Sequence, residues 1–250
     1  MDLGLKGKVA IITGTGSQNG FGKGIALTLA REGCDIVSAD IDIEGAEQTA
    51  AEVEALGRKT LTIKVDVCQK KEVEAMVKQA LDKFSQIDIM VNNAGIASPM
   101  RPFVDTSEKD WDLNINVNYK GTLYGTYAVL PHMLKRGYGK IINISSMAAF
   151  AYPGGSGGTS TYAAAKAAVL VFSKAIMSEV KNSGININVV APSGGDTGFA
   201  EASQASPELR KRIKEMAATG QLTTPQDVGN TVLFFASDIS KRINGQVLIV

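Results

Sequence analysis

Cysteine and histidine are scarce in this sequence. Its 250 residues include two cysteines, Cys34 and Cys68, and one histidine, His132. Two cysteines without CxxC spacing cannot crosslink a chain of this length, so we expect small buried thiols in a reducing compartment. A single histidine excludes a histidine-based metal site and a Ser-His hydrolase triad. No metal site is predicted.

The sequence also lacks an excess of charge and any long apolar run. Its 26 basic and 25 acidic residues give a net charge of +1, so no overall field favours nucleic acid or an anionic membrane. The apolar stretch near the N-terminus spans about five residues, far fewer than a signal peptide or a membrane span needs. We therefore expect an untargeted cytoplasmic protein whose partner is a small molecule or another subunit.

What the sequence does contain is a regular alternation of short β-branched runs and longer helical patterns. Helical patterns cover 21–33, 71–84, 107–136 and 161–181, and hydrophobic residues make up 44% of the chain. Several of the strand-like runs are apolar at consecutive positions, as expected when helices cover both faces of a parallel sheet. This pattern predicts one α/β domain over 1–250, built on a doubly wound parallel sheet of about seven strands. The runs lie at 8–13, 34–40, 60–66, 87–92, 140–145, 185–191 and 246–250.

A glycine-rich loop joins the first predicted strand to the first predicted helix. It reads GTGSQNGFG at 14–22. Glycines allow a tight turn and a close approach of the backbone to a ligand, and the free N–H groups at a helix N-terminus favour a pyrophosphate. A flexible turn is the alternative interpretation. The position between strand and helix favours a dinucleotide site.

Asp40 closes the second predicted strand. A carboxylate there would accept hydrogen bonds from the ribose hydroxyls of an adenosine and would repel a 2′-phosphate. Neither lysine nor arginine directly follows Asp40, so NAD is favoured over NADP. A solvated strand end is the alternative for Asp40. Asp66, after the third strand, could reach the adenine edge.

Tyr162 and Lys166 lie four residues apart in TYAAAKAA. On a helix they share one face, with small alanines between them. A phenol with a pKa near about 10 is a poor base at neutral pH. A lysine ammonium and an oxidised nicotinamide nearby would both favour the phenolate and lower that pKa. By itself the spacing is common by chance, and two ordinary helix residues would explain it.

Several motifs in order along the chain resemble the short-chain dehydrogenase/reductase family. They are the glycine loop, NNAG at 92–95, Asn118 in WDLNINVNYKG, INISS at 142–146 and YAAAK at 162–166. Together they are specific and span most of the chain. The resemblance implies a Rossmann-like fold.

The resemblance also implies a role for each of four catalytic residues. Ser146 would bind the substrate oxygen and Tyr162 would transfer the proton. Lys166 would hold the nicotinamide ribose and tune the tyrosine. Asn118 would bend its helix and place a water that links the lysine to solvent.

The loop, the strand ends and the resemblance together predict a cofactor site. The resemblance places Asn92, Ala94 and Gly95 beneath the cofactor and Thr197 at the nicotinamide carboxamide. Pro192-Ser193 stands where the family usually has Pro-Gly, and Gly194-Gly195 could supply the same freedom. The predicted contacts are Gly14, Ser17, Asn19, Gly20, Phe21, Asp40, Asp66, Val67, Asn93, Ala94, Gly95, Tyr162, Lys166, Pro192, Gly195 and Thr197.

These residues predict an NAD-dependent oxidoreductase that interconverts a secondary alcohol and a ketone. One alternative is an enoyl (C=C) reductase, because the glycine loop is longer than the family's usual TGxxxGxG and matches the enoyl-thioester reductases in length. The enoyl branch, however, spaces its tyrosine and lysine more widely. The other alternative is a catalytically silent nucleotide-binding partner subunit, which would be expected to lack one of the four catalytic residues.

Three segments are predicted to form the substrate pocket: 98–104, 147–160 and 194–216, the last as a mobile lid. Their aromatic and apolar residues weakly favour an apolar or aromatic substrate. The helices over 107–136 and 161–181 resemble those that pair between subunits in this family, which implies a homotetramer or homodimer. The pocket residues in question are Phe103, Met147, Phe150, Tyr152 and Phe199.

Overall fold

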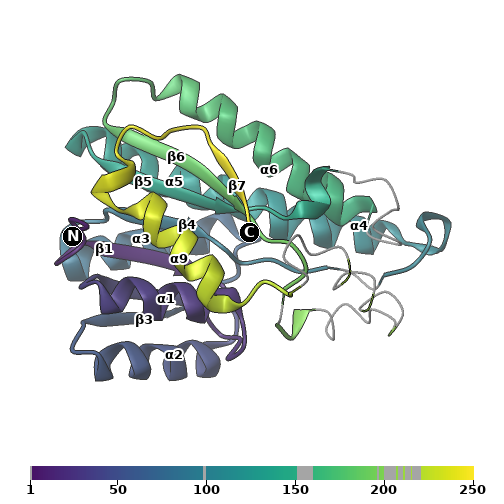
Figure 1. Cartoon of the computed structure of the whole chain (residues 1–250), viewed down its shortest axis with the longest axis horizontal. Coiled ribbons are helices and arrows are strands. Elements are labelled where there is room, and N and C mark those ends of the chain that lie inside the picture. The colour runs from purple at the N-terminus through teal and green to yellow at the C-terminus, as the bar shows by residue number, and fades with distance from the viewer. Residues whose placement is uncertain are drawn as a thin grey trace.

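A seven-stranded parallel sheet organises the chain (Figure 1). The computed structural model describes residues 2–97, 100–150, 160–195, 197–199, 207, 211, 215 and 221–250. Strand order is β3-β2-β1-β4-β5-β6-β7, and every neighbouring pair is parallel. The predicted doubly wound α/β fold is confirmed. The strands are β1 (Val9–Thr13), β2 (Asp35–Asp40), β3 (Thr60–Lys64), β4 (Ile89–Asn92), β5 (Gly139–Ile144), β6 (Ile185–Ala191) and β7 (Val247–Ile249).

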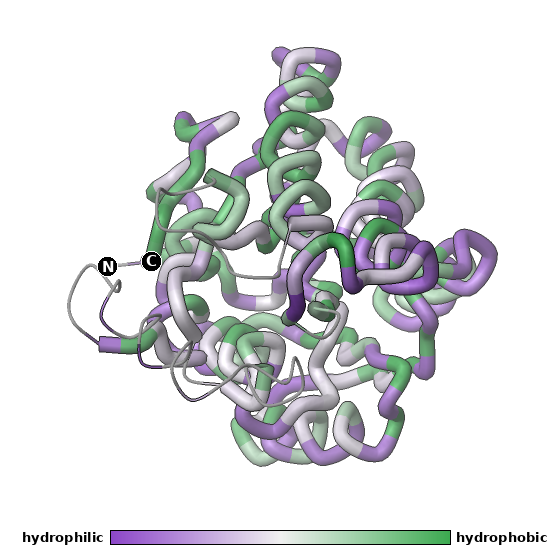
Figure 2. Tube along the Cα trace, turned by 90° about the vertical axis from the view of Figure 1, so that its right-hand side faces the viewer, coloured by the Kyte–Doolittle hydropathy of each residue, from purple (hydrophilic) through white to green (hydrophobic). Residues whose placement is uncertain are grey.

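Helices cover both faces of the sheet. On one face lie α1 (Phe21–Arg31), α2 (Ile43–Ala55) and α9 (Pro225–Ala236). The other face is covered by α3 (Lys70–Phe84), α5 (Gly121–Arg136) and α6 (Ser160–Glu179). Both purple and green recur along the helices in Figure 2, as expected of amphipathic helices that cover a sheet.

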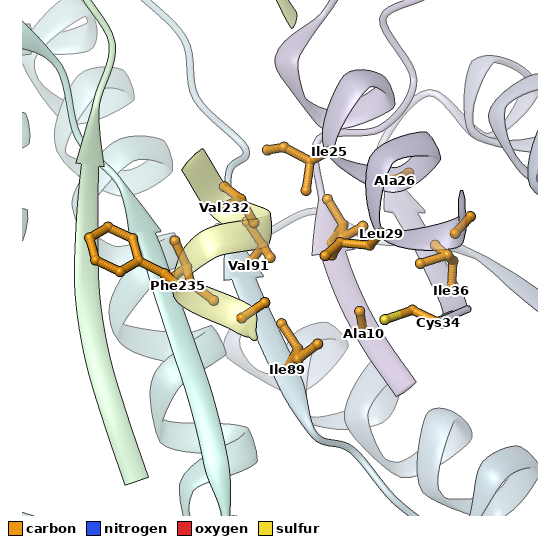
Figure 3. Packing of buried hydrophobic residues seen from close by; sticks show 14 of the residues in the cluster. Ala10, Ile25, Ala26, Leu29, Cys34, Ile36, Ile89, Val91, Val232 and Phe235 are labelled. Atoms are coloured by element: carbon orange, nitrogen blue, oxygen red, sulfur yellow. The ribbon is translucent and has the colours of Figure 1, made fainter. Parts of the chain in front are cut away.

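Two hydrophobic clusters lie on the two faces of the sheet, and successive residues of a strand belong alternately to one cluster and the other. In β1, Ala10 and Ile12 face the α1 side, whereas Val9 and Ile11 face the α3 side. Figure 3 shows the α1 side, where Leu29 of α1 and Phe235 of α9 lie over the strands. Because both faces are buried, each strand needs apolar residues at consecutive positions, and this is why the sequence does not alternate there.

The predicted helix over 107–136 is interrupted. It consists of α4 (Glu108–Asn114), a π-helical turn (Ile115–Lys120) and α5. Ser107 and Asp110 form a capping box that starts α4. Within the π-helical turn the amide of Asn118 donates to the carbonyl of Asn114 (3.0 Å), which competes with the regular backbone bonds.

Some sequence-based expectations lie outside the described residues. Most of the predicted lid over 194–216 does so, as does Tyr152. Three short 3-10 helices, Phe103–Asp105, Met147–Phe150 and Asp238–Ser240, complete the described elements. In the described part of the chain, no helix is long and apolar enough to cross a membrane.

Candidate active site

The candidate site lies at the carboxyl ends of the central strands β1, β4 and β5, which are neighbours in the sheet. In a parallel sheet all carboxyl ends meet at one edge, so the segments that follow Thr13, Asn92 and Ile144 converge there (Figure 1). Every residue predicted to be catalytic lies in or against these segments.

The loop after β1 has the backbone form that the glycines predict. Gly14 has φ +78°, a region that favours glycine, and a side chain on Gly22 would clash with the carbonyl of Gly14. The N-cap of α1 is Gly20, which has no side chain to accept an N–H, and the first turn holds no acidic residue. The positive end of the α1 dipole is therefore open to an anion.

Asn93 and Ala94 lie directly against the glycine loop. Asn93 Nδ2 donates to the carbonyls of Thr13 (2.8 Å) and Gly14 (3.1 Å). Thr13 Oγ1 accepts the backbone N–H groups of both Asn93 and Ala94 at 3.1 Å. Asn92 differs, because its amide is buried and donates to Asn143 (2.8 Å) across the sheet. Thr13, the threonine before the glycine loop, was given no role by the sequence analysis, although it opens the TGxxxGxG pattern.

Asp40 lies at the predicted strand end, beside the glycine loop. Its Oδ2 accepts the N–H of Gly16 (2.7 Å) and its Oδ1 accepts the N–H of Asp42 (2.9 Å). A carboxylate has about four acceptor positions, so both oxygens keep capacity for a ligand hydroxyl. Asp66 Oδ1 accepts the N–H of Cys68 (2.9 Å) within its own turn, and Val67 lies against Gly121.

Asn118 is the buried centre of the π-helical turn. Its Nδ2 donates to the carbonyl of Ile96 (2.7 Å) and its Oδ1 accepts the N–H of Ile96 (3.1 Å). These bonds hold the segment after β4 against the turn. The bent helix that the resemblance implied at Asn118 is present as this π turn.

Lys166 and Gly95 connect Asn118 to the helix that bears Tyr162. Lys166 is 4% exposed, and its Nζ donates to the carbonyl of Ile144 (2.9 Å) at the end of β5. A Cβ on Gly95 would lie 3.0 Å from Asn118 Oδ1 and 3.3 Å from Lys166 Nζ. A side chain at this position would therefore press on both the amide and the ammonium.

Tyr162 lies on the same face of α6 as Lys166, whose Nζ is 5.9 Å from the centroid of the Tyr162 ring. Burial raises the pKa of Tyr162 to about 12, and a hydrogen bond with the side chain of Ser146 partly opposes this. Burial also lowers the pKa of Lys166 to about 8. In the chain by itself, the pKa of Tyr162 thus moves upward, opposite to the shift expected beside a lysine and an oxidised nicotinamide.

The two serines after β5, Ser145 and Ser146, form hydrogen bonds with different partners. Ser146 Oγ accepts the N–H of Ala148 (3.2 Å) and bonds Tyr162. The neighbouring Ser145, which the sequence analysis did not single out, donates to the carbonyl of Lys166 (2.8 Å) and fastens α6 to the strand end. Its place next to Ser146 was the available signal, but only the fold shows which serine faces which partner.

The segment after β6 reaches the same edge of the sheet. Gly195 lies against the ring of Phe21, the first residue of α1, and pairs with Thr223 in a β-bridge. Thr197 Oγ1 accepts the N–H of Phe199 (3.3 Å), and the Phe199 ring lies 5.7 Å from that of Tyr162. Pro192 directly follows β6.

Phe103 and Phe150, two of the predicted pocket residues, are partly exposed, at 54% and 41%. The ring of Phe103 stacks on Trp111 at 5.4 Å between centroids. Met147 begins the 3-10 helix that follows Ser146. Residues 151–159 of the predicted pocket lie outside the described part of the chain.

Comparison with known proteins identifies the family. A family model described as "Enoyl-(Acyl carrier protein) reductase" matches residues 14–250. The subunit BbsD of (2S)-[(R)-hydroxy(phenyl)methyl]succinyl-CoA dehydrogenase from Thauera aromatica is 40% identical over 99% of this chain and 96% of its own length. The chain belongs to the short-chain dehydrogenase/reductase family.

Two further matches to this short-chain dehydrogenase/reductase agree. The 3-oxoacyl-[acyl-carrier-protein] reductase FabG of Thermotoga maritima is 35% identical, covering 98% of this chain and 96% of that protein. A 7α-hydroxysteroid dehydrogenase, solved in complex with NADH and 7-oxo glycochenodeoxycholic acid, superposes with a TM-score of 0.91 at 32% identity, covering 100% of this chain and 94% of that one. The matched proteins are dehydrogenases and reductases, and the chain is an oxidoreductase.

Proposed function

We propose that the chain is an NAD-dependent dehydrogenase that interconverts a secondary alcohol and a ketone, with Tyr162 as the general acid and base. One observation carries this proposal. Tyr162 is hydrogen-bonded to Ser146 and lies on the same helix as Lys166. Gly95 separates Lys166 from Asn118, and this group lies beside the glycine loop. The names of the relatives, which include hydroxyacyl and 3-oxoacyl substrates, support alcohol and ketone chemistry.

The residues at the strand ends fit a dinucleotide. The open N-terminus of α1 would bind the pyrophosphate, and Asp40 would bind the adenosine ribose. Gly14, whose Cβ would lie 2.8 Å from the Cα of Ala94, lets the glycine loop pack directly against the segment after β4. When bound, the nicotinamide supplies the acceptor or donor of the hydride. The carboxylate of Asp40 favours NAD, because it would repel a 2′-phosphate.

Each of the four residues contributes through its own atoms. Tyr162 Oη takes the hydroxyl proton of an alcohol or returns it to a ketone oxygen, and Ser146 Oγ stabilises the charge on that oxygen. The ammonium of Lys166 favours the phenolate over the phenol. Asn118 holds the segment after β4 in place, so that Gly95 in this segment packs against Lys166.

An enoyl reductase is the second candidate, favoured by the description of the matching family model and by the long glycine loop. The spacing of Tyr162 and Lys166, one helical turn apart, favours carbonyl chemistry. Consumption of a conjugated C=C bond with the ketone left intact would identify the enoyl activity.

The test is the absorbance of NADH with the purified protein, NAD or NADP, and a panel of aliphatic, aromatic, cyclic and thioester-linked secondary alcohols. Turnover with NAD on one class is the expected outcome. If no alcohol reacts while NADH still binds by fluorescence, the dehydrogenase proposal is overturned in favour of the enoyl reaction or a silent subunit.

Association into a homotetramer or homodimer stays a prediction, and so does a cytoplasmic location. Light scattering at micromolar concentration tests the first. A monomer would contradict it.

A further inference from the structure

The side chain of Gln18 fastens the glycine loop to the start of α2. Its Nε2 donates to the carbonyl of Gly16 within the loop and to the carbonyl of Gly45 in the first turn of α2, both at 2.9 Å. Its Oε1 accepts Lys23 Nζ at 2.9 Å. Both amide hydrogens and the amide oxygen are thereby used, although the residue itself is exposed.

The same two segments are joined at other points. Gly16 donates its N–H to Asp40, and Thr49 Oγ1 of α2 donates to the carbonyl of Thr15 (2.8 Å). A side chain on Gly45 would clash with the carbonyl of Gly16, and a Cβ on Gly16 would lie 2.9 Å from Asp40 Cγ. Loop and helix start are therefore in direct contact, and Gly16 packs against both Asp40 and Gly45.

Charge in this region is also balanced. Lys23 Nζ lies 2.6 Å from Glu52 Oε1 of α2, as well as against Gln18. Its ammonium is thus held by a carboxylate and an amide. A 2′-phosphate would need free positive charge beside Asp40, whereas the ammonium of Lys23 is already paired with Glu52 and Gln18.

We propose that Gln18 is a positioning residue for cofactor selectivity, which holds Gly16 against Asp40 so that the site accepts the ribose hydroxyls of NAD and excludes a 2′-phosphate. This inference rests on the proposed use of NAD. It assigns a purpose to the extended loop, because Gln18 belongs to the stretch between Gly16 and Gly20 and makes the bonds that join the loop to α2.

The test measures the dissociation constants of NADH and NADPH separately by nicotinamide fluorescence. Gln18→Ala removes the whole contact. Gln18→Met keeps the length of the side chain and removes the two N–H donors without adding a charge. Gln48→Ala is the matched control, because Gln48 is an exposed glutamine of α2. We expect the ratio of the NADPH to the NADH constant to fall about fivefold in both Gln18 variants and to stay unchanged in Gln48→Ala.

The ratio separates positioning from a merely structural role, since general loosening of the loop would weaken both cofactors equally. An unchanged ratio in both Gln18 variants, with NADH still bound by the unsubstituted chain, would overturn this inference alone. Failure of the unsubstituted chain to bind NADH would overturn the proposed function and this inference with it.

Discussion

Two edges of the same sheet each hold a buried lysine that lies within four residues of a tyrosine in the sequence. At the carboxyl edge, Lys166 is 4% exposed and accompanies Tyr162; at the amino edge, Lys140 is 2% exposed and follows Tyr138. Burial lowers the pKa of each lysine and raises the pKa of each tyrosine to about 12. Each ammonium donates to a neutral oxygen, Lys166 to a backbone carbonyl and Lys140 to Asn186 Oδ1 (2.8 Å).

The pairs differ in what surrounds them. Tyr162 has the hydroxyl of Ser146, whereas the hydroxyl of Tyr138 is buried and finds no hydrogen-bond partner among the described residues. Lys166 and Asn118 both lie against Gly95, next to the glycine loop. Lys140, by contrast, lies at the start of β5, at the opposite edge of the sheet. A perturbed tyrosine and lysine are therefore not sufficient to indicate a catalytic pair. The neighbours that can receive a substrate oxygen and a cofactor decide the assignment.

Removing one tyrosine hydroxyl at each edge should give the largest difference in activity between the two edges. Tyr162→Phe should lower kcat by about 10² to 10⁴-fold, because proton transfer is lost, while NADH affinity stays within about twofold. Tyr138→Phe should leave kcat unchanged and leave stability equal or higher, since an unpartnered buried hydroxyl is removed. Steady-state kinetics and thermal unfolding measure both. Retained turnover in Tyr162→Phe would sink the assignment of Tyr162.

The direction of the pH dependence comes next in size. Alcohol oxidation needs the deprotonated form of Tyr162, so its rate should rise with pH by about tenfold per unit below the operative pKa. In this direction that pKa should lie well below 12, because the cationic nicotinamide of NAD favours the phenolate. Ketone reduction needs the protonated form, so its rate should fall above the pKa of Tyr162 in the complex with NADH, which is higher because the reduced nicotinamide is neutral. Initial rates from pH 6 to 10 in both directions test this, and parallel profiles would contradict it.

Asp40 lies at the carboxyl edge of the sheet, beside the glycine loop. Asp40→Ala should lower the preference for NAD over NADP by about tenfold, because both the ribose acceptor and the repulsion of a 2′-phosphate are lost. Asp40→Asn is the control, since it keeps an acceptor for the N–H of Gly16 and removes only the charge. The ratio of kcat/KM values with the two cofactors measures the change. An unchanged preference in both variants would move the role to Asp42 or to the loop.

A pair of glycines gives the smallest expected effect. Gly95→Ala should lower kcat severalfold with little loss of stability, because its Cβ would press on Asn118 and Lys166. Gly57→Ala should do the reverse. Gly57 has φ +76° with open space around it, so alanine there costs about 1 kcal/mol of strain far from the site. Kinetics and denaturant unfolding of both variants distinguish the two outcomes, and equal kcat in both would argue against a tight fit at Gly95.

The strands could be predicted because their signal is local, whereas the candidate catalytic residues were singled out by family motifs in order along the whole chain. Consecutive apolar residues such as those in β1 follow from burial on both faces, and Tyr162 and Lys166 share a face through helical spacing alone. The hydrogen bonds between the side-chain amide of Asn118 and the backbone of Ile96 join separate segments of the chain, so no local pattern indicates them. The upward pKa shift of Tyr162 was missed for the same reason, since burial is a property of the folded chain.

The π-helical turn at 115–120 has a consequence for how this gene can vary. An i→i+5 turn accommodates one more residue than an α-helical turn, so the segment reads as a helix with a single residue inserted. Removing one codon between 115 and 117 would allow α4 and α5 to merge into one regular helix, and Asn118 would rotate by about 100° away from Ile96. A one-residue deletion here would thus preserve the helix and disable the site, whereas most point substitutions on its outer face would leave both the helix and the site intact.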